Sequence, residues 1–229
     1  MAFALKTVVP WGRSFEEYVR MFALKKKDLE SRILGCADGP AGFNAQMHKA
    51  GFRVVSCDPL YRYSVRSIRN RINRTYQKIL KQLETNQSDY VWKTFRDPKH
   101  VGRVRMRAMM IFLQDFDQGK KEKRYVPQGL PCLPFKDRSF DIALCSHLLF
   151  LYSRQLSLDF HLRSVLEMCR VAKEARIFPL LDLGGQPSPY VKPLIQKLER
   201  MGFHTEIRKV RYEFQQNGNK MLKVCKTSS

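Results

Sequence analysis

The stretch RILGCADGPAGFNAQMHKAGFRVVSCDP, residues 32–59, contains the pattern that determines the fold. Residues 32–34, Arg-Ile-Leu, predict a short buried strand, which we expect to end in the glycine-rich turn 35–40. A helix is predicted over 43–50 and a second buried strand over 53–57, closed by an Asp-Pro dipeptide. Strand, glycine-rich turn, helix, strand and acid in this order form a βαβ unit, so the sequence predicts an α/β fold built on parallel strands.

The alternation of strand and helix stops between residues 61 and 128. Apolar residues recur there at spacings of three and four, which predicts an amphipathic helix through Val65, Ile68, Ile72, Tyr76, Ile79 and Leu83. A second helical stretch is predicted near 99–117. The segment contains seventeen Lys or Arg and six Asp or Glu, so we interpret 61–128 as a basic helical insertion after the second strand.

Strands and helices alternate again in the rest of the chain. The predicted elements are a strand at 140–145, a helix at 157–172, a strand at 176–181 and a helix at 189–201 that ends at Gly202. Two strand-like stretches, TEIRKVRYEF and KMLKVC, then flank Asn217-Gly218, which is a strong signal for a β-hairpin. We therefore expect the sheet to end in an antiparallel hairpin.

The first residues, 1–31, are interpreted as a helical lead-in to this sheet. Ser14 and Glu17 stand at the start of an amphipathic run with the spacing of a capping box. A further helical turn is expected near Asp28. The chain has 229 residues and shows neither repeats nor low-complexity segments, so residues 1–229 are predicted to form a single domain.

Composition limits the possible partners and the compartment. The chain has 42 Lys and Arg and 21 Asp and Glu, a net charge of +21, which favours contact with polyanions or gives a soluble basic surface. The six cysteines form no C-x-x-C pair, which argues against a zinc site, and their apolar surroundings suit a reducing compartment. Because neither a leader peptide nor a run of about 18 apolar residues is present, we expect a cytoplasmic protein without a transmembrane segment.

The glycine-rich turn and the acid after the second strand form the candidate ligand site. Gly35, Gly39 and Gly42 would let the backbone approach a ligand, with N–H groups at the start of the following helix free to bind it. Asp58 lies about twenty residues further on, where an acid accepts hydrogen bonds from the ribose hydroxyls of an adenosine group. The alternatives are a turn that only reverses the chain and an aspartate that only caps it. We favour ribose contact.

Two features favour S-adenosylmethionine over a nicotinamide cofactor. They are the segment LPFKDRSFDIALCSH, residues 133–147, and a terminal hairpin in place of a dehydrogenase's parallel second half. With VVPWGRSFEEY near the start and RIFPLLDL later, the chain resembles the class I S-adenosylmethionine-dependent methyltransferases, and within them a bacterial branch with a helical insertion after the second strand. The resemblance covers nearly the whole chain and implies a Rossmann-like sheet with the cofactor across the carboxyl ends of the first strands.

The resemblance also implies roles for individual residues. The methionine part of the cofactor would lie on the turn, the ribose after the second strand and the adenine after the insertion. The implied cofactor-binding residues are Gly35, Cys36, Ala37, Asp38 and Gly39, then Asp58 and Pro59, then Leu130, and finally Cys145 and Ser146 at the end of the fourth strand. His147 would lie beside the reacting sulfonium as a candidate base; the alternative is a histidine hydrogen-bonded within a strand–helix corner.

The chain departs from the family pattern at several positions. Ile33 stands where the family has an acid, Ala37 replaces the second glycine, and Gly129 occupies the place of the acid near the adenine. Asp38 is a candidate to take over part of the first acid's role. The altered motif leaves two possibilities, a pocket that still supports methyl transfer and a pocket that only binds.

Three further side chains have two possible roles. Trp11 and Arg13 would either fold over the cofactor as a lid or belong to a lead-in packed on the sheet edge. Asp182 would either cap a loop or face the acceptor.

These observations support three hypotheses. The first is a methyltransferase without a metal, whose acceptor is a small molecule, RNA or protein and whose insertion recognises that acceptor. The second is a non-catalytic protein of the same fold that binds nucleic acid through its basic surface. In both, the insertion would contact RNA through phosphate pairing and stacking, with Tyr61, Tyr63, Tyr76, Tyr90 and Trp92 as candidates, unless its arginines only form a solvated face. The third, a nicotinamide-dependent oxidoreductase, is disfavoured by the terminal hairpin.

Overall fold

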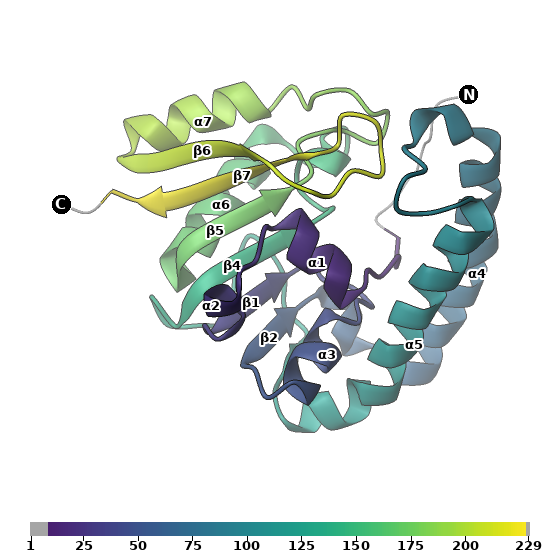
Figure 1. The fold of residues 1–229 in the computed structure, drawn as a ribbon. Coiled ribbons are helices and arrows are strands. Elements are labelled where there is room, and N and C mark those ends of the chain that lie inside the picture. Colours follow the sequence, from purple (N-terminus) through teal and green to yellow (C-terminus); the bar gives the residue numbers. More distant parts are fainter. Residues whose placement is uncertain (1–8, 228–229) are drawn as a thin grey trace.

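The computed structural model describes residues 9–227, in which helices surround a seven-stranded sheet (Figure 1). The strands are β1 (Ile33–Cys36), β2 (Val54–Cys57), β3 (Tyr125–Val126), β4 (Phe140–Ser146), β5 (Ala172–Phe178), β6 (Phe203–Lys209) and β7 (Lys220–Lys226). The α-helices are α1 (Phe15–Met21), α2 (Lys26–Leu29), α3 (Phe43–Lys49), α4 (Val65–Thr85), α5 (Pro98–Lys121), α6 (Leu158–Val171) and α7 (Val191–Arg200). Short 3-10 turns, η1 (Pro59–Arg62), η2 (Gln87–Asp89) and η3 (Phe150–Tyr152), lie between them.

The sheet order is β3-β2-β1-β4-β5-β7-β6. The first five strands are parallel, and β7 lies antiparallel between β5 and β6. This confirms the predicted α/β, Rossmann-like sheet with an antiparallel end. The strand order reverses between β1 and β4, and ligands of such sheets bind outside the carboxyl ends of the strands at this point.

Both faces of the sheet are covered because the short parallel strands are apolar on both sides. Leu34 and Cys36 of β1 point to the face covered by α6 and α7, while Ile33 points to the face covered by α1 and α3. The predicted capping box is present at the start of α1, where Ser14 and Glu17 each bond the other's backbone N–H. The lead-in therefore packs on the sheet as a helix; residues 1–8 of the predicted lead-in lie outside the described residues.

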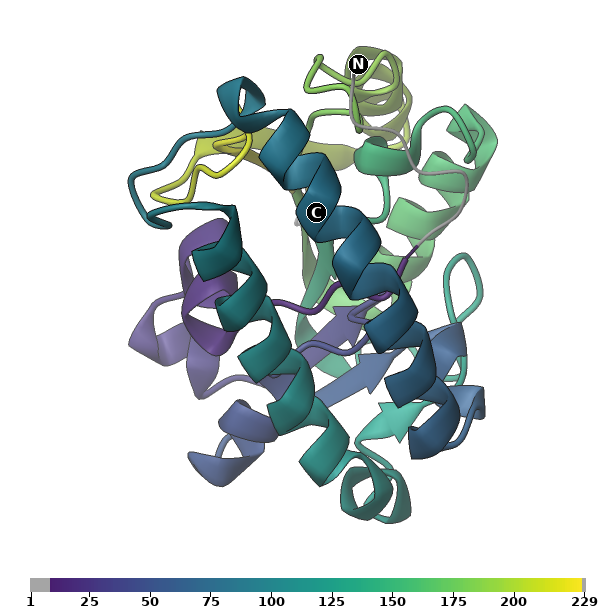
Figure 2. The ribbon, with the colours of Figure 1, turned by 90° about the vertical axis from the view of Figure 1, so that its right-hand side faces the viewer.

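Helices α4 and α5 form an antiparallel pair along one side of the molecule (Figure 2). The predicted apolar stripe of α4 is buried, with Ile68 and Ile72 packed against Phe112 of α5. Helix α5 in turn packs on α3. The predicted segment 61–128 is not wholly helical, because Tyr125–Val126 pairs with β2 as strand β3. Two residues between helical patterns are too short for a period-two signal to detect.

Two other boundaries differ from the predictions. Gly35 and Cys36 belong to β1 and not to the turn, because β2 and β4 pair with β1 on both sides as far as Cys36. Strand β5 spans Ala172–Phe178 and not 176–181, since it begins directly after α6 and ends where Pro179 cannot donate a ladder hydrogen bond.

The terminal hairpin has a wide loop where a two-residue turn was predicted at Asn217-Gly218. Strands β6 and β7 pair as expected, but Val210 N donates to Asn219 O over 2.8 Å and encloses the residues between them as a loop. Tyr212 and Phe214 in this loop pack into apolar clusters with the lead-in and with α4. This long-range packing outweighs the local turn signal.

No helix among residues 9–227 has both the length and the apolar character needed to cross a bilayer.

Candidate functional site

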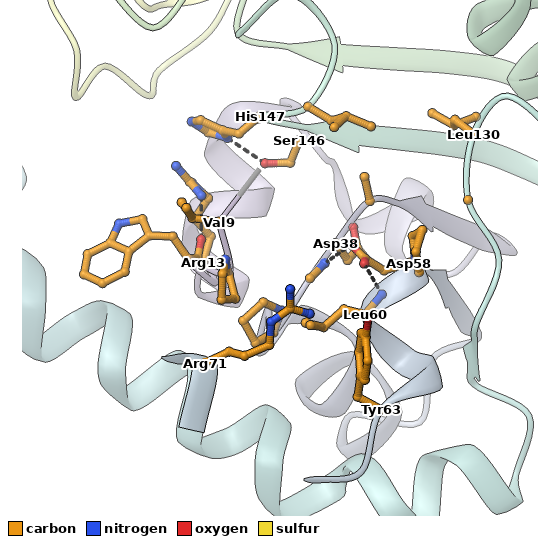
Figure 3. Close-up of a pocket in the computed structure, with 18 of the residues that line it drawn as sticks. Val9, Arg13, Asp38, Asp58, Leu60, Tyr63, Arg71, Leu130, Ser146 and His147 are labelled. Atoms are coloured by element: carbon orange, nitrogen blue, oxygen red, sulfur yellow. Dashed lines mark hydrogen bonds between the residues drawn. The ribbon is translucent and has the colours of Figure 1, made fainter. Parts of the chain in front are cut away.

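A cavity of about 400 Å³ lies at the carboxyl ends of β1, β2 and β4, where the strand order reverses (Figure 3). Eight of the predicted site residues line it: Ala37, Asp38, Gly39, Asp58, Pro59, Leu130, Ser146 and His147. Figure 3 shows Ser146 and His147 on one side of this first cavity and Asp58, Leu60 and Tyr63 on the other. The structure thus brings together side chains from three strands that are separated in the sequence.

Three predicted residues do not line the first cavity. Gly35 and Cys36 are inside β1, and Cys145 is inside β4, where each is paired with neighbouring strands. Both thiols are fully buried, and burial raises the pKa of Cys145 to about 12. These cysteine side chains therefore pack in the core behind the lining residues and do not face the cavity.

The carboxyl group of Asp38 is buried under the turn that follows β1. Its Oδ1 accepts a 2.8 Å hydrogen bond from the Tyr18 hydroxyl, and its Oδ2 accepts one of 2.6 Å from Ser56. Burial raises the pKa of Asp38 to about 6 in spite of these two bonds, which favour the charged form. Gly35 is required beneath it, because a Cβ there would lie 1.8 Å from Oδ2.

Asp58 links the turn after β1 to the turn after β2 by hydrogen bonds. Its Oδ2 accepts a 2.9 Å hydrogen bond from Gly39 N, and its Oδ1 accepts one of 2.7 Å from Leu60 N at the start of η1. Burial raises the pKa of this carboxyl group. Asp58 thus caps a turn, the second of its two expected roles, and it also lines the first cavity, where each carboxylate oxygen retains a second lone pair. Ribose contact stays a prediction.

The departures from the glycine motif have local structural reasons. Ala37 has φ +58°, the left-handed conformation for which glycine is the usual residue. Gly129 has no room for a side chain, since a Cβ there would lie 2.8 Å from Cδ of Pro59. Ile33, at the position of the family's first acid, is fully buried in the core beside α1 and α3. The buried carboxyl group of this turn is that of Asp38.

His147 lies directly after β4 with its ring against Phe178, in a backbone conformation of φ +56°. Its Nδ1 and the Ser146 hydroxyl are 2.7 Å apart, and its backbone N donates to Phe178 O over 2.7 Å. Burial, and then the positive charges of Arg13 and Arg105, hold its pKa well below the usual range. The ring is therefore neutral at pH 7, and in the tautomer that donates from Nδ1 to Ser146, Nε2 is available to take a proton.

The lead-in supplies Trp11 and Arg13 to the wall of the first cavity. Arg13 O accepts a 3.0 Å hydrogen bond from Gly42 N, and Gly12 presses against the turn so closely that a Cβ would lie 2.1 Å from Pro40 O. Residues 11–13 thus lie against the glycine-rich turn itself. Asp182, whose role was open, caps its own loop by accepting bonds of 2.8 Å from Gly184 N and 3.1 Å from Gln186 N.

Sequence reasoning missed the contribution of α4 to the first cavity. Arg71 extends from this helix into the cavity, and its guanidinium lies 4.9 Å from the ring centre of Tyr63, which is 42% exposed. The available signal was that the predicted helix begins a few residues after Asp58, which places its first turns beside the carboxyl end of β2. Pro10, Leu60 and Phe160 are further lining residues without a sequence signal.

Comparison with the sequences of known proteins identifies a relative of this chain. It is 32% identical over 219 residues to the uncharacterized protein MJ0045 of Methanocaldococcus jannaschii, a match that covers 95% of this chain and 96% of the relative. The chain belongs to the family of MJ0045. No protein-family model matches it.

Comparison with solved structures concerns the fold alone. The mitomycin 7-O-methyltransferase MmcR superposes with a TM-score of 0.50 at 10% identity, covering 93% of this chain and 54% of that one. The PH0226 protein of Pyrococcus horikoshii OT3 gives a TM-score of 0.49 at 12% identity, with 93% and 89% covered. The MJ0045-family chain therefore has the Rossmann-like fold of class I S-adenosylmethionine-dependent methyltransferases.

Proposed function

We propose that this chain is an S-adenosylmethionine-dependent methyltransferase whose acceptor is a small molecule or RNA. The observation that carries the proposal is the pair formed by Gly39 and Asp58, which joins the turns after β1 and β2 at the edge of the first cavity. A carboxylate at this position can accept hydrogen bonds from a ribose, and left-handed turns beside it let the backbone approach a ligand. Membership of a bacterial branch within this class stays a prediction.

The first cavity fits this cofactor in size and chemistry. Its volume of about 400 Å³ lies within the range of ligand sites. Asp58 would bind the ribose, the apolar surfaces of Leu60 and Leu130 would hold the adenine, and the turn at Ala37 and Asp38 would lie against the methionine part. When bound, S-adenosylmethionine supplies a methyl group on a positively charged sulfur.

The chain itself would contribute alignment and a base. Trp11, Arg13 and Leu148 form part of the wall beside His147 and would limit access of water. His147 is neutral at pH 7 and would take the proton that the acceptor loses, through Nε2. The left-handed backbone at Ala37 is the conformation that glycine would adopt, so the altered motif keeps the shape of the turn.

Calorimetric titration with S-adenosylhomocysteine, with NAD as a control ligand, tests the proposal. We expect binding in the micromolar range for the unchanged protein and a loss of about tenfold or more in Asp58→Asn, which removes the charge but keeps an oxygen for the Leu60 N–H. Asp159→Asn, an exposed carboxylate on α6, is the matched control and should bind normally. Absence of binding by folded protein would contradict the proposal.

One observation supports contact with RNA, which the non-catalytic alternative requires. Helix α4 exposes Arg66, Arg74, Lys78 and Lys81, and none of them forms an ion pair with a carboxylate among residues 9–227. Such a row suits the phosphates of RNA. If RNA binds there, replacing two of these residues by Gln should lower the slope of log affinity against log salt by about 1.4, as measured by fluorescence anisotropy. Methyl transfer to any defined acceptor would contradict the non-catalytic role.

A further inference from the structure

A second cavity, of about 100 Å³, adjoins the first. Trp11, Arg13 and His147 line both cavities and form the boundary between them. The candidate base thus faces the second cavity as well as the first. A group held there would be next to His147 without occupying the space assigned to the cofactor.

The walls of the second cavity combine aromatic and aliphatic side chains. They come from segments far apart in the sequence and include Trp11, Tyr90, Tyr152, Phe178, Tyr212 and Phe214. The rings are packed on one another: Tyr90 and Phe214 stack with centres 4.7 Å apart, and Phe178 meets Tyr212 edge-on at 5.7 Å. Aromatic walls of this kind favour a flat apolar ligand, which stacks or packs edge-to-face on them.

The volume limits the ligand to a single ring. A cavity of roughly 150 Å³ holds a benzene molecule, so about 100 Å³ is filled by less than one ring, and the rest of a single-ring ligand must lie at the boundary with the first cavity, beside Arg13 and His147. A fused ring system or a nucleotide does not fit. This excludes an RNA base together with its sugar as the occupant of the second cavity.

Arg13 provides a positive charge at the boundary that the protein leaves without a counter-ion. Its Nη1 donates to Trp11 O over 2.7 Å, its Nε is buried without a hydrogen-bond partner, and no carboxylate within residues 9–227 forms an ion pair with it. The neighbouring Arg105, in contrast, is paired with Glu17 and bonded to Tyr212. A partly buried guanidinium without a counter-ion is unfavourable, so an anionic ligand group would be bound well there.

We propose that the second cavity is the acceptor site and takes a single-ring aromatic compound with a carboxylate group, its ring among the aromatic walls and its carboxylate on Arg13. The inference that this ligand is the methyl acceptor rests on the proposed methyltransferase function. Binding of the aromatic carboxylate in the second cavity does not depend on that function. The competing assignment for Arg13 is the carboxylate of the cofactor's methionine part, and the experiment separates the two.

Benzoate is the probe, and benzamide is its neutral counterpart of the same shape. The chain has two tryptophans, so in Trp92→Phe the fluorescence reports on Trp11 alone, which lines the second cavity. We expect benzoate to change this fluorescence saturably, with and without S-adenosylhomocysteine, and to bind about tenfold or more tightly than benzamide. Arg13→Gln should abolish the preference, and Arg163→Gln, an exposed arginine on α6, should keep it.

Leu183→Phe provides a second, sterically different test, because Leu183 is a partly buried wall residue on a loop. We expect it to lose benzoate binding while S-adenosylhomocysteine binding stays within about threefold. No saturation by benzoate up to about 10 mM, or equal affinity for benzamide, would overturn the inference even if the cofactor binds normally.

Cofactor titrations of Arg13→Gln complete the design. If this variant weakens S-adenosylhomocysteine but not 5′-methylthioadenosine, which lacks the carboxylate, then Arg13 belongs to the cofactor site and the acceptor inference is wrong. Failure of any cofactor analogue to bind, with benzoate still bound through Arg13, would contradict the proposed function alone.

Discussion

The Tyr18 hydroxyl donates a 2.8 Å hydrogen bond to Oδ1 of Asp38, so helix α1 holds the carboxyl group of the turn after β1. The stacking of Tyr18 on Phe43, with ring centres 4.4 Å apart, fixes the tyrosine between α1 and α3. The lead-in is therefore a structural part of the site: through Tyr18 it positions the only buried carboxyl group that the described residues place beneath this turn.

Because of Asp38, the free energy of unfolding should fall as pH rises. Burial raises the pKa of Asp38 in the folded state to about 6, above the usual value of 3.8, so the folded state binds the proton more tightly than the unfolded chain does. The resulting loss of about 3 kcal/mol begins near pH 4 and is complete above pH 6. In urea unfolding at pH 4 to 7, Asp38→Asn should therefore gain stability relative to the unchanged protein as pH rises, while Asp159→Asn should not. A constant difference would refute this assignment.

Ala37→Gly should stabilise the protein. Ala37 has φ +58°, and a side chain in this conformation destabilises the folded state by about 1–2 kcal/mol. Glycine removes this strain, but its greater flexibility in the unfolded chain lowers the free energy of unfolding by about 0.4–1 kcal/mol. The expected gain of about 0.5–1 kcal/mol is measurable as a higher urea midpoint. Ala50→Gly, at φ −83°, is the control and should lose stability. The same result for both variants would mean that Ala37 is not strained.

The buried pair of Glu17 and Arg105 should be important for folding rather than for binding. Both side chains are buried, Tyr212 OH donates to Glu17 Oε1 over 2.8 Å, and the three groups join α1, α5 and the 210–219 loop. Arg105→Met leaves the Glu17 carboxylate buried without its cation and should lower the free energy of unfolding by about 3–5 kcal/mol. In a double-mutant cycle with Glu17→Gln the losses should be strongly non-additive. Additive losses would show that the two groups act independently.

His147→Gln should lower kcat by about 10²–10⁴-fold and leave the affinity for S-adenosylhomocysteine unchanged, because the ring would act on the acceptor's proton. Because burial, and then the charges of Arg13 and Arg105, hold the pKa of His147 well below its usual range, activity should persist at pH values where an ordinary histidine is already protonated. Arg13 is one of the charges that lower this pKa, so Arg13→Gln should move the acid limb of the pH profile to higher pH. An unchanged kcat in His147→Gln would exclude the histidine as base.

Local patterns were sufficient to predict the βαβ unit with Asp58 after its second strand, and the resemblance to class I methyltransferases implied that Asp38, Asp58 and His147 converge at one edge of the sheet. This follows because carboxyl ends of parallel strands meet at the same edge, so residues that follow strands become neighbours. Gly35 was assigned to the turn since glycine is a turn residue, whereas its function is to leave space for Asp38 within a strand.

The second cavity had no counterpart in the sequence patterns. Its walls combine Trp11 with Tyr90, Tyr152 and Phe214, whose proximity depends on the docking of α4 and of the terminal loop. The pairing of Glu17 with Arg105, 88 positions apart, depends on the same packing. Spacing along one element identifies which face is buried, but not which distant segment covers it.

Helix α4 connects the two cavities. Its first half supplies Arg71 to the first cavity, and its second half supplies Ile79 and Leu83 to the second. Because a single helix of 21 residues forms part of both walls, any displacement of it on occupation of one cavity changes the shape of the other. The affinities of the two ligands are then thermodynamically coupled by the same factor, whichever ligand binds first.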